Sequence, residues 1–215
     1  MSLSLPQMCA ATVLVACVLA MSGCKFVKTA DQQAEAAAGA FDPDKLVADI
    51  WDAKVVPYLK GRAGSFQDVS ALVSGNLDAA AQKYGHKEKQ GNAPWTFAAS
   101  VKGKIVAAET KSRAGSVDVD VDGDGKADVR VAIGPAIRGT AIRDALDFVN
   151  FNEFKNQIEW AQYGKAFNTR INTLSLEKLP RDGLVGREVE ALGAYPLPAA
   201  GQLPQFVPVT ITVGG

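Results

Sequence analysis

Residues 120–128 carry the densest set of side chains that could bind a cation. Aspartates at 120, 122, 124 and 128, with Gly125 after the third, give the spacing D-x-D-x-D-G-x-x-D. Ca²⁺ takes about six to eight oxygen ligands, and alternate carboxylates on a tightly turning loop can supply several of them. The twelfth loop position is Val131 rather than Glu, so an EF-hand is not expected. The spacing predicts a calcium site at Asp120, Asp122, Asp124 and Asp128. The alternative is a polar β-turn, and Lys126 within the loop favours that alternative.

Two other groups of side chains could bind a ligand. Arg138 and Arg143 stand beside the start of a short predicted helix, where they could hold an anion or a carboxylate. The alternative is a helix cap with a solvated Arg143–Asp144 pair. Trp160 and Tyr163 could stack on a sugar ring, whose faces are apolar CH patches. Alternatively, the two rings pack their helix onto the rest of the protein.

Catalytic signatures are missing from the sequence, which contains no G-x-S-x-G, no H-E-x-x-H and no Walker loop. The single histidine, His86, stands among charged residues before a loop and is expected at the surface. Paired acids can support glycoside hydrolysis, but Asp122 and Asp124 are expected on a turn tip rather than across a walled cleft. Lys plus Arg and Asp plus Glu both number 23, with no long run of one sign, so nucleic-acid binding is not expected.

The acidic loop lies between strands of a predicted sheet. Apolar residues alternate with polar ones over 95–107, 117–121 and 129–133, which gives one apolar and one polar face. Gly123 and Gly125 supply the positive φ angles that a tight reversal needs. Two further strands are predicted at 186–195 and 207–213, and Pro208 places the start of the last one at a sheet edge or a bulge.

Helices are predicted before and within this sheet. Asp42 and Pro43 start a helix that Pro57 is expected to kink or end. Ser65 caps a second helix, which Gly85 closes. After a short helix ending near Val149, residues 150–152 cap a longer one that runs to about Ile171. The residues expected to face inward on that helix are Phe154, Ile158, Ala161 and Phe167.

The order of elements predicts an α+β, mainly β fold. Five strands with a helical insertion between the third and fourth is the order of an OB-like barrel, and an α+β open sheet is the alternative. The expected division is a lipoprotein signal peptide at 1–23, a lipidated tether at 24–40, an N-terminal helical segment at 41–91 and the barrel at 92–215. The helical insertion is expected at about 140–172.

The N-terminus predicts export and anchoring. Met8 to Met21 is an uncharged apolar run, too short to span a bilayer comfortably, and Ser22, Gly23 and Cys24 follow it. This stretch resembles the bacterial lipobox, in which the cysteine receives lipid and becomes the mature N-terminus. An ordinary signal peptide or an uncleaved anchor is the alternative. By resemblance to the lipoprotein sorting pattern, Lys25 permits transfer to the outer membrane, which is favoured over the inner one.

The lipobox, the segment FDPDKLVADIWDAKVVPYL and the stretch from Val117 to Asn168 together resemble a family of predicted periplasmic lipoproteins. The family is classed as a domain of unknown function, and its genes tend to lie beside sugar ABC transporter genes. The resemblance implies a periplasmic location and a sugar-uptake context, and it transfers no catalytic residues. We therefore expect a non-enzymatic binding or scaffolding accessory, whose partner is a solute-binding protein or permease. A carbohydrate or cell-wall hydrolase using the acidic loop and a purely structural envelope protein are the alternatives.

Overall fold

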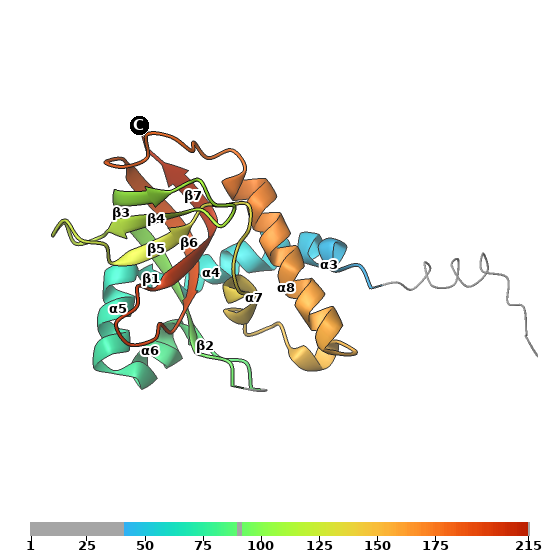
Figure 1. The fold of residues 1–215 in the computed structure, drawn as a ribbon. Coiled ribbons are helices and arrows are strands. Elements are labelled where there is room, and N and C mark those ends of the chain that lie inside the picture. Colours follow the sequence, from blue (N-terminus) through green and yellow to red (C-terminus); the bar gives the residue numbers. More distant parts are fainter. Residues whose placement is uncertain (1–40, 90–91, 215) are drawn as a thin grey trace, which may run out of the picture. The chain divides into compact units, whose positions relative to one another are not determined.

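Five strands close into a barrel in the computed structural model, which describes residues 41–89 and 92–214 (Figure 1). The strands are β3 (Thr96–Glu109), β4 (Ser116–Asp120), β5 (Val129–Ala132), β6 (Glu188–Pro196) and β7 (Gln205–Val213). They follow the order β3-β4-β5-β7-β6, and β6 pairs back with β3. Only β5 and β7 run parallel among these pairs. This is the OB-fold order, so the predicted barrel is confirmed and the open sheet is wrong.

The alternating sequence pattern builds the barrel core. In the β4–β5 hairpin, Val119 pairs with Val129 and Val117 with Val131, and all four side chains are buried. Between these pairs, Asp118 faces Arg130 on the outer surface. The Arg130 guanidinium donates from Nε and Nη2 to the two Asp118 oxygens at 2.6 and 2.8 Å. The predicted hairpin is therefore present, with its apolar residues inside and an ion pair outside.

Neighbouring strands of the barrel approach each other closely at two glycines. A Cβ added to Gly103 would collide with the Asp120 carbonyl oxygen, and one added to Gly193 would collide with that of Val207. Opposite Gly193, the register of β6 against β7 shifts, so that β7 carries one more residue than β6 there. The bulge lies at Pro208, as predicted, because proline has no N–H to give to the ladder.

The seam between β5 and β7 is short, with only the pairs Arg130–Gln205 and Val131–Phe206. Side chains from outside the barrel supply further hydrogen bonds around it. The Ser175 hydroxyl donates to the Val209 carbonyl at 2.5 Å, and Arg181 donates to the carbonyls of Ile133 and Leu176. The helical insertion and the loop after it thus help to close the barrel.

The first helical stretch runs past its proline. It consists of α3 (Pro43–Ile50), a π-helical turn η1 (Trp51–Val55) and α4 (Val56–Arg62). Asp42 caps it as predicted, accepting the Lys45 N–H at 3.0 Å. The expectation that Pro57 ends or kinks the helix is only partly right, because the chain remains helical but widens into the π turn. In this turn the Val56 N–H reaches the Trp51 carbonyl, just before the residue that has no N–H.

The second predicted helix is two helices, α5 (Phe66–Gly75) and α6 (Leu77–Tyr84). Asn76 leaves the helical conformation and accepts the Ala79 N–H, so it caps α6. Two-residue strands flank the pair: β1 (Gly64–Ser65) and β2 (Gly85–His86) both join β3. The surface placement predicted for His86 holds only in part. The residue is half-buried, and its Nδ1 lies 2.8 Å from the Asp144 carbonyl oxygen.

The insertion contains α7 (Ala141–Asp144), a 3-10 turn η2 (Phe151–Glu153), α8 (Gln157–Ile171) and a π turn η3 (Asn172–Leu176). Asn150 caps only the 3-10 turn, and Asn156 starts the long helix by accepting the N–H groups of Ile158 and Glu159. The prediction that Ile158 and Ala161 face inward is wrong, since both are exposed. The buried face consists of Tyr163, Gly164, Ala166, Phe167 and Ile171. Figure 1 shows α3 and α8 side by side on one flank of the barrel, away from α5 and α6.

Tyr195 has an unusual environment for a phenol. Its side chain is 1% exposed, and its hydroxyl has no hydrogen-bond partner among the described residues. Burial raises the pKa of Tyr195 well above its ordinary value. Tyr195→Phe removes the unsatisfied hydroxyl and is expected to stabilise the fold by about 1 kcal/mol in urea unfolding at pH 8.

The same substitution should change the response to alkali. The unfolded state loses the phenolic proton near pH 10, before the folded state does, so wild-type stability falls as the pH rises above that value. The advantage of Tyr195→Phe over wild type should therefore widen between pH 8 and pH 10.5. A less stable variant at pH 8 would contradict the prediction, since it would mean that the hydroxyl is hydrogen-bonded, for example to a buried water.

Candidate functional site

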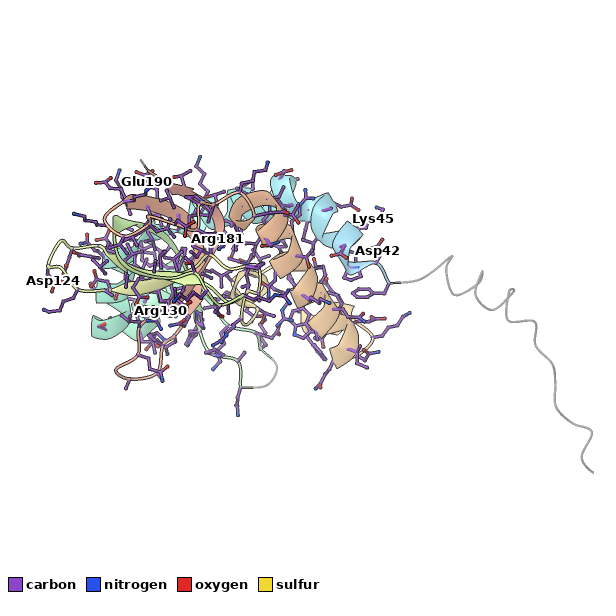
Figure 2. The ribbon with its side chains drawn as sticks, turned by 45° about the horizontal axis from the view of Figure 1, so that its top comes forward. Asp42, Lys45, Asp124, Arg130, Arg181 and Glu190 are labelled. Carbon is purple, nitrogen blue, oxygen red and sulfur yellow. The ribbon has the colours of Figure 1, made fainter. Side chains whose placement is uncertain are left out.

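The acidic loop projects from the barrel between β4 and β5. Figure 2 shows Asp124 on this loop, at the opposite end of the described body from Asp42 and Lys45. Asp120, Asp122 and Asp124 each present a carboxylate oxygen, and these oxygens lie within 4.8 Å of one another. Asp128 lies outside this group; its carboxylate accepts the Val121 N–H at 2.7 Å. Three of the four predicted calcium ligands therefore converge.

Hydrogen bonds from the loop's own backbone hold the carboxylates. Asp120 is 6% exposed and accepts the N–H groups of Gly123 and Gly125 at 2.7 and 2.8 Å. Asp124 accepts the Lys126 N–H at 2.7 Å and the Lys126 ammonium at 3.1 Å. Both hydrogen bonds lower the pKa of Asp124, and the backbone hydrogen bond has the larger effect. The loop is thus a well-bonded turn whose carboxylates still have oxygen lone pairs for a cation, and the geometry fits both alternatives.

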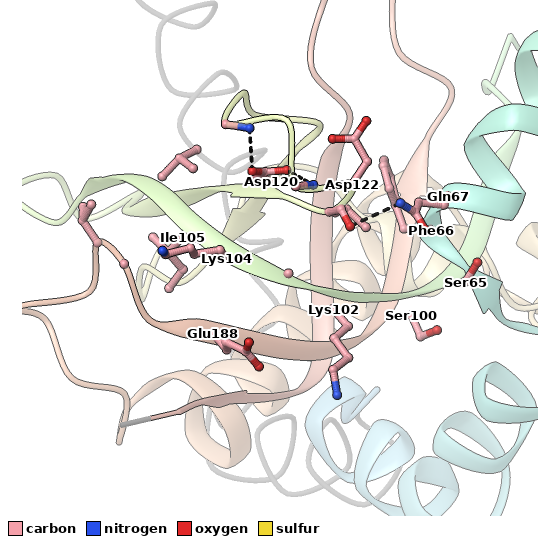
Figure 3. A pocket seen from close by; sticks show the side chains of 17 residues that line it. Ser65, Phe66, Gln67, Ser100, Lys102, Lys104, Ile105, Asp120, Asp122 and Glu188 are labelled. Carbon is pink, nitrogen blue, oxygen red and sulfur yellow. Dashed lines mark hydrogen bonds between the residues drawn. The ribbon is translucent and has the colours of Figure 1, made fainter.

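A groove of about 1180 Å³ runs beside this loop. Figure 3 shows the loop with Asp120 and Asp122 on one side of β3, and Ser65 and Gln67 at the start of α5. The Gln67 amide donates to the Val121 carbonyl at 3.2 Å, which ties α5 to the loop. Lys102 points away from the acidic loop in Figure 3 and forms an ion pair with Glu190 of β6. Lys102 therefore does not neutralise the aspartates of the loop.

This geometry does not favour acid–base hydrolysis. A general acid needs a raised pKa, which comes from burial or from a like charge in a walled site. Asp122 and Asp124 are exposed, and the pKa of Asp124 is lowered by its hydrogen bonds. The loop accordingly suits cation binding or turn formation better than proton donation.

Calcium is expected to raise the melting temperature of the wild-type protein, because a ligand that binds only the folded state stabilises it by about 2.7 kcal/mol at a hundredfold excess over its dissociation constant. For a chain of this size that is roughly 5–11 °C. Differential scanning fluorimetry with calcium and with a chelator measures the shift. Asp122→Asn combined with Asp124→Asn should remove it. Identical wild-type melts at millimolar calcium would identify the loop as a plain turn.

The structure separates the two predicted arginines. Arg143 is 8% exposed and does not face solvent as an open anion site. Its Nε donates to Asp144 at 2.8 Å, Nη1 to the Trp160 carbonyl at 2.9 Å and Nη2 to Thr140 at 3.0 Å. The Thr140 hydroxyl in turn donates to Asp144 at 2.6 Å. Arg143 is thus the centre of a network that joins α7 to α8.

Arg138 lies elsewhere, on the rim of a groove of about 390 Å³ that we call the β4–β5 groove. It is exposed and makes no ion pair with the residues that the structure describes. The groove is lined by the residues Glu109, Ser112, Ala114, Gly115, Ser116, Arg130, Ala132, Ala136, Arg138, Gln205, Phe206 and Val207. The sequence did not single out Arg130 as a binding residue. The available signal was the alternation of its strand, which places Arg130 on the polar face of the sheet. The groove lies between the β3–β4 loop and the start of β7, where OB folds bind extended ligands.

Trp160 and Tyr163 also differ in their surroundings. Tyr163 is 6% exposed and packs against Phe154 and Phe167. Burial, together with a smaller effect of the Glu153 charge, raises the pKa of Tyr163 to about 12. Trp160 is half-buried, and the Arg143 guanidinium lies 3.8 Å from the centre of its ring. Tyr163 therefore belongs to the core, whereas Trp160 lines a hollow between α7 and α8.

Sequence comparison assigns the chain to a family. Residues 14–212 match the family described as "Predicted periplasmic lipoprotein (DUF2291)", which is nearly the whole chain. The chain belongs to this DUF2291 family. Membership supports a periplasmic, membrane-anchored protein. The predicted lipidation site of this lipoprotein, Cys24, lies outside the described residues. Within the described residues, no helix combines the length and apolarity needed to cross a bilayer.

Structural comparison supports the fold of this DUF2291 member. It resembles the crystal structure of an OB-fold protein from Thermotoga maritima with a TM-score of 0.61 and 18% sequence identity. The likeness covers 81% of this chain and 99% of the other. A comparison with curated proteins gives no match. Neither the family nor the structural neighbour indicates an enzyme.

Proposed function

We propose that this lipoprotein is a non-enzymatic binding accessory of sugar uptake, which holds a solute-binding protein or a permease through the β4–β5 groove. The observation that carries the proposal is the groove itself, with Arg130 and Arg138 beside a floor of small residues. The sugar-uptake context comes from the family resemblance in the sequence. The lipid anchor would hold the barrel at the periplasmic face of a membrane.

The chemistry of the groove suits an extended polypeptide segment. Ala132, Ala136 and Gly115 leave room for a backbone to approach the barrel. Arg130 is fixed by its two bonds to Asp118, which largely neutralises its charge. Arg138 has no such partner among the described residues and can pair with a carboxylate of the bound segment. An acidic side chain on the partner is therefore expected to meet Arg138.

Co-purification from native membranes tests this proposal. The full-length, lipidated protein is captured with a C-terminal tag, and the associated proteins are identified by mass spectrometry. Arg138→Glu should reduce recovery of the solute-binding protein or permease several-fold. Lys165→Glu, an equal charge change on an exposed residue of α8, is the matched control and should have no effect. Equal recovery with both variants, or recovery of no transporter component, would contradict the proposal.

Anchoring at Cys24 gives a separate prediction. Mass spectrometry of the mature N-terminus should show acylated Cys24. Cys24→Ser should release the protein from the membrane fraction, because it removes the residue that carries the lipid and a stable anchor takes at least two acyl chains. We further propose the outer membrane as its destination, with Lys25→Asp expected to shift the protein to the inner membrane in fractionation. An unmodified N-terminus at another residue would contradict the anchoring.

A further inference from the structure

The hollow between α7 and α8 has the size and walls of a small-molecule site. Its volume is about 530 Å³, which lies within the usual range of ligand pockets, about 300–1,000 Å³. Its lining residues are Glu88, Thr140, Arg143, Phe151, Gln157, Trp160 and Ala161. None of these residues lines the β4–β5 groove or the groove beside the acidic loop. We call this hollow the Trp160 pocket.

One part of the Trp160 pocket is apolar and another is polar. The rings of Phe151 and Trp160 lie edge to face, with centres 5.8 Å apart, and the exposed Ala161 methyl group adds to the apolar part. The exposed Gln157 amide supplies a donor and an acceptor to the polar part. A ligand that fits both parts must have an apolar surface bordered by hydrogen-bonding groups.

Arg143 lines this pocket and has a donor that no described hydrogen bond uses. A guanidinium carries five N–H groups. The described hydrogen bonds take one from Nε, one from Nη1 and one from Nη2, and Nη2 also lies 2.7 Å from an Asp144 oxygen. One Nη1–H therefore has no acceptor among the described residues, in a side chain that is 9% exposed and lines the pocket. A ligand oxygen would satisfy this buried donor.

Charge narrows the class of ligand. Asp144 already pairs with Arg143, so the pocket offers no uncompensated cation among its described lining for a phosphate. A purely apolar ligand would leave Gln157 and the free Arg143 N–H without partners. We propose that the Trp160 pocket binds a neutral pyranose, whose apolar CH face lies toward Phe151 and Ala161 and whose hydroxyls meet Gln157 and Arg143.

Titration of the purified mature protein with D-glucose, D-galactose and D-xylose tests the proposal, with inorganic phosphate as the comparison. Two-dimensional NMR reports the site, because the Trp160 indole N–H signal is assigned by its loss in Trp160→Phe. At least one sugar should shift this signal saturably. Gln157→Ala removes a hydrogen-bonding group and should weaken binding by about tenfold. Ala161→Leu should block the pocket without removing any polar group.

Gln162→Ala is the matched control, since Gln162 is an exposed glutamine of the same helix outside the pocket. It should bind sugar as wild type does. Arg138→Glu should also keep sugar binding while losing the protein partner, so the two proposals can fail separately. The pocket proposal is overturned if none of the three sugars shifts the indole signal, if phosphate alone does, or if Gln157→Ala and Gln162→Ala behave alike.

Discussion

Gly193→Ala is expected to lower the free energy of unfolding by about 3 kcal/mol or more. A Cβ at this position would overlap the Val207 carbonyl oxygen and lie 2.8 Å from the Pro208 Cα. Both atoms belong to the backbone of β7, so a side-chain rotation cannot relieve the clash. The strand would have to move at the bulge that joins β6 to β7. Thermal unfolding should show a midpoint lower by roughly 6–12 °C.

Gly61→Ala is the matched control for this experiment. Gly61 lies in α4, is exposed, and has no neighbouring atom within 4 Å of an added Cβ. Alanine favours helix over glycine by about 1 kcal/mol, so this variant should melt at or above the wild-type temperature. If Gly193→Ala and Gly61→Ala melted together, the close approach of β6 and β7 would be disproved.

Arg143→Met is expected to destabilise the protein by about 3–5 kcal/mol, since removal of one member of a buried ion pair leaves the other without compensation. Asp144 would lose its guanidinium partner, and the Trp160 carbonyl and Thr140 hydroxyl would each lose a donor. Lysine cannot reproduce the planar fork, so Arg143→Lys should recover little of the loss. Urea unfolding measures both variants. Arg138→Met, at an exposed arginine, should stay within about 0.5 kcal/mol of wild type.

Gly164→Ala checks the same network from the opposing helix. Its added Cβ would lie 2.6 Å from Thr140 Cγ2 and 2.8 Å from Arg143 Nη1. Alanine should therefore destabilise α8 at Gly164 although it favours α4 at Gly61. A stabilising Gly164→Ala, together with an Arg143→Met variant as stable as Arg138→Met, would show that the network does not join α7 to α8.

The barrel could be predicted because its signals are local. Alternation around Val119 and Val131 defined the faces of the hairpin, and Pro208 marked the bulge through its missing N–H. The boundaries of the helices in the insertion were harder to predict. Asn150 and Asn156 can both cap a helix, and only packing decides which one starts α8. The inward face was also predicted incorrectly, since Ile158 is exposed.

The candidate sites show the same limit. The aspartate spacing is a local signal, and three of its carboxylates do converge. Arg143 gave no sign of burial in the sequence, because its acceptors on Thr140 and Trp160 are brought together by tertiary packing. The β4–β5 groove likewise joins Arg130 and Arg138 with Gln205 from the last strand. Such a site is formed by residues from distant parts of the sequence, so it cannot be recognised from local sequence patterns.

The short seam of β5 with β7 has a consequence for folding. β7 is the last strand, and it pairs with both β5 and β6, whose sequence positions are far apart. A folding intermediate in which β7 has not docked therefore exposes the unpaired edges of two strands at once. Open strand edges are templates for pairing with another chain, and they are most hazardous in partly folded molecules. We therefore expect docking of β7, which covers both edges, to protect the folding chain against aggregation.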